Sequence, residues 1–206
     1  MADVALTGVA EEREGAPAPP LEIPHFDIVP RVGLVLSAIL LAGVIAAIAT
    51  NSKWAVDGFH VAGGAAWTIL DLFLGFVLGP IMGSMTIPAR IEFITKLMPK
   101  MVVIMPTVVT MTLASGWQLS TQLGTNQTSS PVHGWVVASF IIVGVMSVIA
   151  LGLLEPANIA VLTELKKRRP NPEVVEKLMK RFMYSAGILG TMQIATLIIM
   201  TKIATA

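Results

Sequence analysis

The chain has 206 residues, of which 54% are hydrophobic and only 13% are charged. A soluble globular chain carries about 25% charged residues, so this chain has too little polar surface to dissolve as one. The formal net charge of +1 favours neither nucleic acid nor an acidic substrate as a partner. The sequence contains no cysteine, which excludes disulfides, thiolate metal sites, iron–sulfur clusters and thiol catalysis.

Residues 1–28 are predicted to form a disordered, cytoplasmic N-terminal tail. The segment MADVALTGVAEEREGAPAPPLEIPH is acidic and rich in proline and alanine. It has no positively charged region followed by an apolar core, so it does not resemble a signal peptide. Residues 29–206 are expected to form a single transmembrane domain.

Five apolar runs follow the tail, and each is near or above the ~20 residues that a helix needs to cross a ~30 Å hydrocarbon core. They cover about residues 31–50, 59–86, 101–119, 134–155 and 183–203. Only helices satisfy their own backbone hydrogen bonds in lipid. The expected fold is therefore an all-α integral membrane protein with five spans, in a plasma or inner membrane.

The distribution of lysine and arginine predicts the orientation, because basic residues in short loops resist translocation. Basic residues gather between spans 2 and 3 and between spans 4 and 5. They are Arg90, Lys96 and Lys100 in the first loop, and Lys166, Lys167, Arg168, Arg169, Lys177, Lys180 and Arg181 in the second. The loops after spans 1 and 3 contain one basic residue, Lys53. We expect the N-terminus inside and the C-terminus outside, with Trp54, Trp117 and Trp135 at the outer interface.

A weak internal duplication relates the two halves of the chain. A shift of 81 residues places Lys96-Leu97-Met98 on Lys177-Leu178-Met179 and Thr110-Met111 on Thr191-Met192. This pattern predicts a four-helix bundle of two parallel two-helix repeats, spans 2–3 and 4–5, with span 1 peripheral. Span 2 would pack beside span 4 around an axis along the membrane normal. Chance similarity between apolar helices is the alternative.

His60 and His133 lie at the predicted outer ends of spans 2 and 4, so the repeat would place them at the same depth. Neutral imidazole is the usual axial ligand of haem iron, and helical bundles build such sites from facing helices. Gly63, Gly64 and Gly134 would leave room for a flat macrocycle. The alternative is that each histidine lies at the outer interface without a ligand.

Asp71 is an acid within an apolar span. On a helix, Gly64, Trp67 and Asp71 lie within about 40° of His60, and Asp71 lies about 16 Å deeper. A carboxylate facing lipid is costly, so Asp71 is expected to face the bundle interior, protonated or paired. The candidate partners are Thr110, Gln193 and Thr191. Such an acid marks a proton path or substrate site, or it holds the bundle together.

Two further patterns follow the helical period. Gly75, Gly79 and Gly83 form a small-residue ladder that predicts close helix packing. Met98, Met101 and Met105 recur near the start of span 3. These thioethers either bind Cu(I) or fill gaps between helices.

The segment FHVAGGAAWTILDLFLGFVLGP resembles the His-containing helix of a loose superfamily of small bacterial membrane proteins. That group includes copper-resistance D-type proteins, membrane protoporphyrinogen oxidases and predicted membrane proteins of unknown role. The segment PKMVVIMPTVVTMTLASGWQLS resembles the group's next helix, and the likeness covers about 60 of 206 residues. In the group's motif a tryptophan follows the histidine by about seven residues, as Trp67 follows His60 here. The resemblance implies haem b or haem-linked chemistry with His60 as a ligand. Thr68 and Asp71 depart from the group's pattern, and no basic residue in the outer half of the helices matches the porphyrin-oxidising members.

Three functions remain open from the sequence. The first is a membrane haem b protein that passes electrons between a membrane quinone and an outward-facing redox protein, alone, as a homo-oligomer or within a larger membrane complex. The second is copper transport or handling by His60, His133 and the methionines. The third is a structural subunit without a site. No P-loop, G-x-S-x-G or H-E-x-x-H motif occurs, so an enzymatic activity is neither indicated nor excluded.

Overall fold

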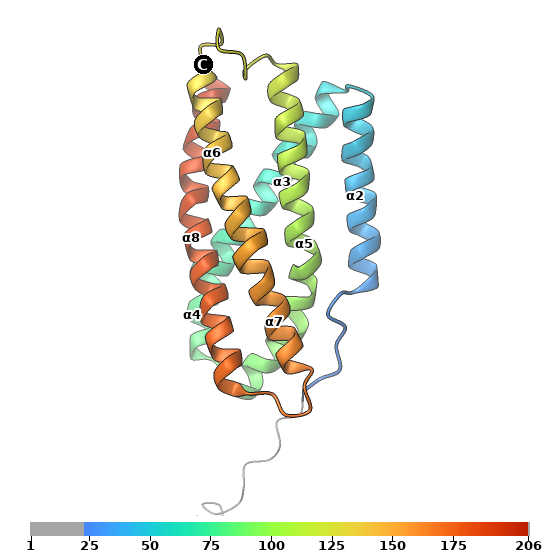
Figure 1. Ribbon diagram of the computed structural model, residues 1–206, viewed down its shortest axis with the longest axis vertical. Coiled ribbons are helices and arrows are strands. Elements are labelled where there is room, and N and C mark those ends of the chain that lie inside the picture. Colours follow the sequence, from blue (N-terminus) through green and yellow to red (C-terminus); the bar gives the residue numbers. More distant parts are fainter. Residues whose placement is uncertain (1–22, 206) are drawn as a thin grey trace, which may run out of the picture.

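The computed structural model describes residues 23–205, and every regular element in that range is helical. The elements are α2 (Arg31–Ala49), α3 (Lys53–Leu72), η1 (Phe73–Leu78), α4 (Gly79–Ser84), α5 (Ile87–Gln122), α6 (His133–Ile149), η2 (Ala150–Leu154), α7 (Glu155–Leu165) and α8 (Pro172–Thr205). The segments η1 and η2 are π-helical. Because α3, η1 and α4 run on without a break, as do α6, η2 and α7, the chain forms five rods (Figure 1).

All five rods are long and apolar enough to cross a membrane, as the sequence predicts. Two of them extend beyond the apolar runs: α5 begins at Ile87 and α8 at Pro172. The added turns are amphipathic and carry ion pairs at i, i+4 spacing, with 2.5 Å between Lys96 Nζ and Glu92 Oε1. Their charges lower the local hydropathy without breaking the helix, so the apolar runs understate the length of these helices.

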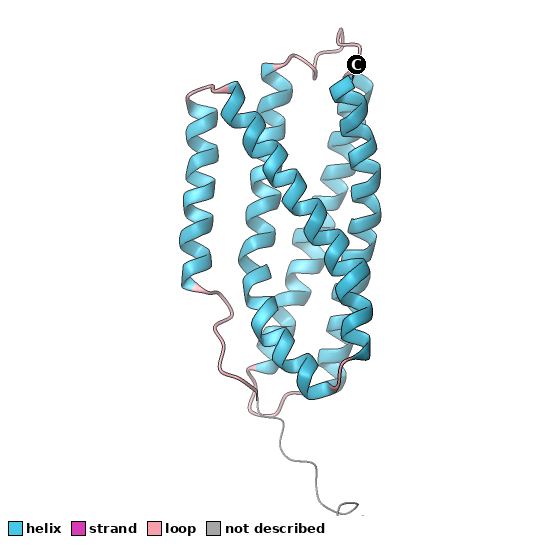
Figure 2. Ribbon diagram, turned by 180° about the vertical axis from the view of Figure 1, so that it is seen from behind, coloured by secondary structure: helices cyan, strands magenta, loops and turns pink. Residues whose placement is uncertain are grey.

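Each rod has a defined set of neighbours (Figure 2). The helix α3 packs against α5 and α8, the α6–α7 rod packs against α8, and α7 also packs against α5. The expectation that span 2 packs beside span 4 is therefore wrong, because α5 and α8 lie between the two rods. Among the four rods of spans 2 to 5, each rod packs mainly against two of the others, and its hairpin partner is one of them.

Span 1, formed by α2, lies at the edge of the assembly against α5 and α3, as predicted (Figure 1). Its buried residues are Val44 and Ala47 alone. A hydrogen bond of 2.7 Å from Thr107 Oγ1 to Ser37 Oγ ties it to α5. Most of its apolar surface therefore faces away from the protein.

The two π-helical segments occur at corresponding places in spans 2 and 4. Pro80 lies in the first turn of α4, directly after η1, and Pro156 lies in the first turn of α7, directly after η2. A proline inside a helix has no N–H and its ring collides with the carbonyl four residues earlier. The wider π turn takes up this conflict, so the rods continue through their prolines.

The core joins residues from every rod except α2. Met98, Met101 and Met105 are all buried in it. The glycine ladder gives one close contact: a Cβ on Gly75 would lie 2.9 Å from the Cα of Gly187 in α8. A Cβ on Gly83 would meet nothing within 4 Å. Close helix packing is thus confirmed at Gly75 and is absent at Gly83.

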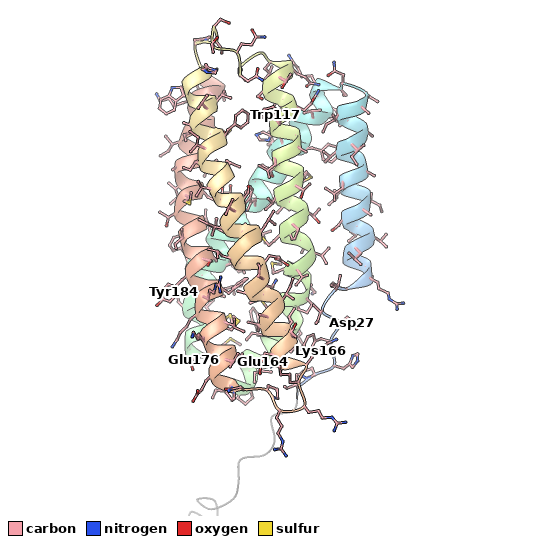
Figure 3. The ribbon with its side chains drawn as sticks, in the orientation of Figure 1. Asp27, Trp117, Glu164, Lys166, Glu176 and Tyr184 are labelled. Atoms are coloured by element: carbon pink, nitrogen blue, oxygen red, sulfur yellow. The ribbon has the colours of Figure 1, made fainter. Side chains whose placement is uncertain are left out.

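The two ends of the bundle differ in charge. The loop between α7 and α8 and the described part of the N-terminal segment share one end, and the loop of residues 123–132 lies at the other (Figure 1). Figure 3 places Glu164 and Lys166 near the first end and Trp117 near the second. Residues 23–28 of the predicted tail lie against the basic end, where Lys166 Nζ is 5.5 Å from the Phe26 ring centroid. Residues 1–22 lie outside the described range.

Candidate functional site

His60 lies between α3 and α5, with one ring nitrogen held by the backbone of α5. Its Nδ1 is 3.1 Å from the carbonyl oxygen of Thr112. Because a carbonyl only accepts hydrogen bonds, this contact assigns the proton to Nδ1. The lone pair of the neutral imidazole is then on Nε2, which is the nitrogen available to a metal ion.

Gly116 provides the surface on which the His60 ring lies. A Cβ at Gly116 would be 2.7 Å from His60 Cε1 and 2.9 Å from Nδ1, closer than any side chain can approach. The ring therefore lies against bare backbone of α5, one turn beyond the carbonyl that it binds. This contact explains the need for glycine in the Ser115-Gly116 pair.

His133 is the first residue of α6, on the rod diagonally across from α3. Its side chain is half-buried, and its Nδ1 is buried without a hydrogen-bond partner among residues 23–205. Helices α3 and α6 both begin at the end of the bundle that carries residues 123–132 (Figure 1). His60, however, lies about two turns inside α3.

The other residues assigned to a cofactor have different surroundings. A Cβ on Gly63 would lie 2.7 Å from Thr112 Oγ1, so this glycine serves the close crossing of α3 and α5. A Cβ on Gly64 would lie 3.9 Å from Thr112 Cγ2, and a Cβ on Gly134 would meet nothing within 4 Å. Gly134 alone of the three adjoins open space. Over the described range, no group of three or more His, Asp or Glu side chains could hold a metal ion.

A second polar site lies deeper in the bundle, between α3 and α8. Asp71 is completely buried. The Gln193 amide donates to Asp71 Oδ2 over 3.3 Å, and Thr68 Oγ1 donates to Gln193 Oε1 over 3.0 Å. The predicted inward orientation of Asp71 and its pairing with Gln193 are confirmed. The other two candidate partners, Thr110 and Thr191, are exposed.

Two buried polar atoms of this second site lack partners in the part of the chain that the structure describes. They are Asp71 Oδ1 and Trp67 Nε1, and Trp67 is 2% exposed. The indole of Trp67 lies beside the Asp71 carboxyl. Trp67, which the sequence groups with His60, thus belongs to the environment of Asp71.

Sequence reasoning missed a second buried acid. Glu155 is 7% exposed, and both of its carboxylate oxygens lack partners within residues 23–205. Asn158, one turn further on, donates to the Met98 carbonyl over 3.3 Å. Glu155 ends an apolar run, which suggests a membrane interface, but the helix continues to Leu165. Pro156, directly after Glu155, also suggested a helix end, so no signal in the sequence pointed to the burial of this acid.

The two sites differ in the chemistry they allow. His60 has one imidazole nitrogen, Nε2, that is not hydrogen-bonded to the described residues, whereas Asp71 has a carboxyl oxygen with neither a hydrogen-bond partner nor an ion-pair partner within residues 23–205. Comparison of the chain with protein-family models, curated proteins and solved structures finds no match.

Proposed function

We propose that this protein is a membrane haem b protein for electron transfer, acting alone or as a subunit of a membrane redox complex. The observation that carries the proposal is the hydrogen bond from His60 Nδ1 to the Thr112 carbonyl. Metal-binding histidines usually donate their other N–H in this way, which fixes the ring and makes the ligating nitrogen more basic.

The proposed membrane location is supported by the five apolar rods, and the proposed orientation by the difference in charge between the two ends of the bundle. Exposed tryptophans, Trp54, Trp117 and Trp135, are suited to the outer interface. The basic end would face the cytoplasm and the end with residues 123–132 would face outside. Because the chain has no cysteine, single cysteines can report this directly.

An impermeant thiol reagent applied to intact cells should label cysteines placed at residues 121–133. It should leave cysteines at residues 166–172 unlabelled until the cells are opened. Labelling of the basic loop in intact cells would reverse the orientation and move His60 to the cytoplasmic side.

His60 and His133 are the residues that would hold the haem iron. The His60 ring is oriented for ligation by the Thr112 carbonyl and by the bare backbone at Gly116. The Nδ1 of His133, buried and without a hydrogen-bond partner among residues 23–205, would be the second imidazole nitrogen at this end of the bundle. Haem bound by these two histidines would supply a one-electron couple. Their place near the outer end favours an outward-facing redox protein as partner, with a membrane quinone as the other.

Copper handling has less support from the geometry. Met98, Met101 and Met105 are buried in the hydrophobic core, where they pack against apolar side chains of other rods. Buried methionines of this kind fill irregular gaps between helices.

An absorbance spectrum of the purified protein with and without dithionite tests the proposal. The reduced protein should show the sharp α band of a b-type cytochrome. His60→Ala and His133→Ala should each give high-spin or haem-free protein, while Met98→Leu, a buried change of similar volume, should leave the spectrum unaltered. A colourless protein from haem-replete cells would refute the haem assignment.

A further inference from the structure

Asp71 has no role in the proposed haem site, yet it is the most completely buried acid of the described chain. An ionised carboxylate in such a place is costly without a counter-ion, whereas a neutral carboxylic acid needs only hydrogen bonds. We propose that Asp71, together with Thr68, Gln193 and Trp67, forms a proton-binding site inside the helix bundle. Its ligand is a proton that exchanges with water.

The hydrogen bonds leave one place for this proton. Asp71 Oδ2 accepts from the Gln193 amide. Thr68 donates to the Gln193 carbonyl oxygen, and this orients the amide so that its N–H₂ group faces the carboxyl. Oδ1 has no donor from residues 23–205, so it is the oxygen that carries the proton.

The site also contains donors for the ionised form. The Gln193 amide would stay in place, and the buried Trp67 N–H, which lies beside the carboxyl without a partner, could turn to the free oxygen. A carboxylate is stabilised by such donors. These donors favour the ionised form, whereas burial favours the neutral form, which has no charge to desolvate.

No other titratable group faces Asp71 from the elements packed against it. Segment η1 has none, and the ion pairs of the described residues all lie elsewhere. The titratable residues of α5 and α8 are exposed on the outside of the bundle, except for the half-buried Arg90. They are Arg90, Glu92, Lys96, Lys100, Glu173, Glu176, Lys177, Lys180, Arg181, Tyr184 and Lys202. Proton exchange at Asp71 thus changes the charge of the site by one unit without compensation.

A metal cation fits this environment poorly. The oxygens of Thr68 and Gln193 are engaged with each other, and the groups that face the carboxyl, the Gln193 amide and the Trp67 indole, are N–H donors. Donors repel a cation, and a hard cation requires several oxygen ligands. A proton binds covalently to one carboxyl oxygen and needs no such set of oxygen ligands, so it is the cation that the site can take.

A close backbone contact between η1 and α8 lies next to the site. Asp71 lies two residues before η1, and Gly75 in η1 meets Gly187 of α8 without any side chain between the backbones. Gln193 is on the same helix as Gly187, so this contact helps to hold Gln193 beside Asp71. Single π turns inside helices are frequent at functional sites.

Dicyclohexylcarbodiimide provides the test, because it reacts with protonated carboxyls in apolar surroundings to give a stable N-acylurea. The intact protein would be treated in native membranes over a range of pH and its peptides analysed by mass spectrometry. Asp71 should be labelled at neutral pH, and labelling should fall as the pH rises. Glu92, exposed and paired with Lys96, is the internal control that should remain unlabelled. Absence of label on Asp71 at every pH would overturn the proposal.

Two variants separate proton binding from a purely structural hydrogen bond. Gln193→Leu removes a donor to the carboxylate, so the pH at which labelling is half lost should rise by about one unit, a tenfold change in proton affinity. Thr68→Val should raise this pH by a smaller amount. Thr191→Val changes an exposed residue near Gln193 and should leave this pH unchanged. An unchanged profile in Gln193→Leu would overturn the proposal.

Two further measurements define the ligand and its independence from haem. Protection from labelling by sodium ions at constant pH would assign a metal cation and refute the proton assignment. In the His60→Ala variant, dicyclohexylcarbodiimide should label Asp71 to the same extent as in the parent protein. Loss of labelling in this variant would overturn the proposal of a proton site that is independent of haem. If only the haem proposal is wrong, the labelling of Asp71 should be unchanged.

Discussion

The two helical hairpins, α3 to α5 and α6 to α8, contain the same kinds of feature, but within residues 23–205 the histidine and the buried acid are hydrogen-bonded to other helices only in the first. Each opening rod has a histidine, a buried acid and a π turn followed by proline. His60 and Asp71 both have hydrogen-bond partners on other helices. In the part of the chain that the structure describes, His133 Nδ1 and the Glu155 oxygens have none. A shared pattern of polar residues along a rod therefore does not produce a shared site.

The difference arises from what the neighbouring helices present. Along α3, the helix α5 offers a carbonyl and a bare glycine, and α8 offers an amide. Glu155 has only Asn158 of its own helix beside it, and that amide N–H₂ group is engaged by the Met98 carbonyl. Three comparisons of matched variants test this asymmetry.

The largest expected effect is at the glycine beside His60. In Gly116→Ala the new methyl group would lie 2.7 Å from His60 Cε1, so the ring must leave its position. Haem bound in the proposed way should lose its low-spin spectrum. Gly144→Ala, further along α6 and outside the proposed haem site, meets nothing within 4 Å and should keep it. A normal spectrum in Gly116→Ala would show that His60 does not ligate from this position.

The second comparison concerns the two π turns. Gly75→Ala places a methyl group 2.9 Å from the backbone of Gly187, and such overpacking should cost about 1–3 kcal/mol. Gly152→Ala in η2 meets nothing within 4 Å and should not destabilise the protein. Thermal unfolding in detergent, with both variants measured beside the parent, checks the difference. Equal stabilities would show that the η1–α8 contact is looser than described.

The smallest difference is expected between two buried amides. Gln193→Ala breaks two hydrogen bonds and leaves Thr68 and Asp71 without this partner, which should cost about 1–3 kcal/mol. Asn158→Ala removes one bond together with an amide oxygen that has no partner over the described range, so it should cost about 1 kcal/mol or less. Denaturant titration of the two variants measures both. If Asn158→Ala lost more free energy of unfolding than Gln193→Ala, the polar contact of Asn158 would be the more stabilising of the two.

Much of the fold follows from residue chemistry that needs no neighbour. An apolar run of sufficient length predicts a helix that satisfies its own backbone, and five such runs give five rods. The separation of basic and uncharged loops predicts which helix ends meet. The cost of an acid facing lipid predicts that Asp71 turns inward, and the amide of Gln193 was among its expected partners.

The tertiary structure alone decided which rods are neighbours and which polar groups are bonded. An apolar surface packs against many others at similar free energy, so hydropathy does not choose between α8 and α6 as the neighbour of α3. That choice depends on small residues and polar partners that meet only after assembly, such as Gly75 with Gly187 and Asp71 with Gln193. The partner of His60 was equally hidden, because it is a backbone carbonyl, a group that every residue possesses and that only the approach of α5 brings to the ring.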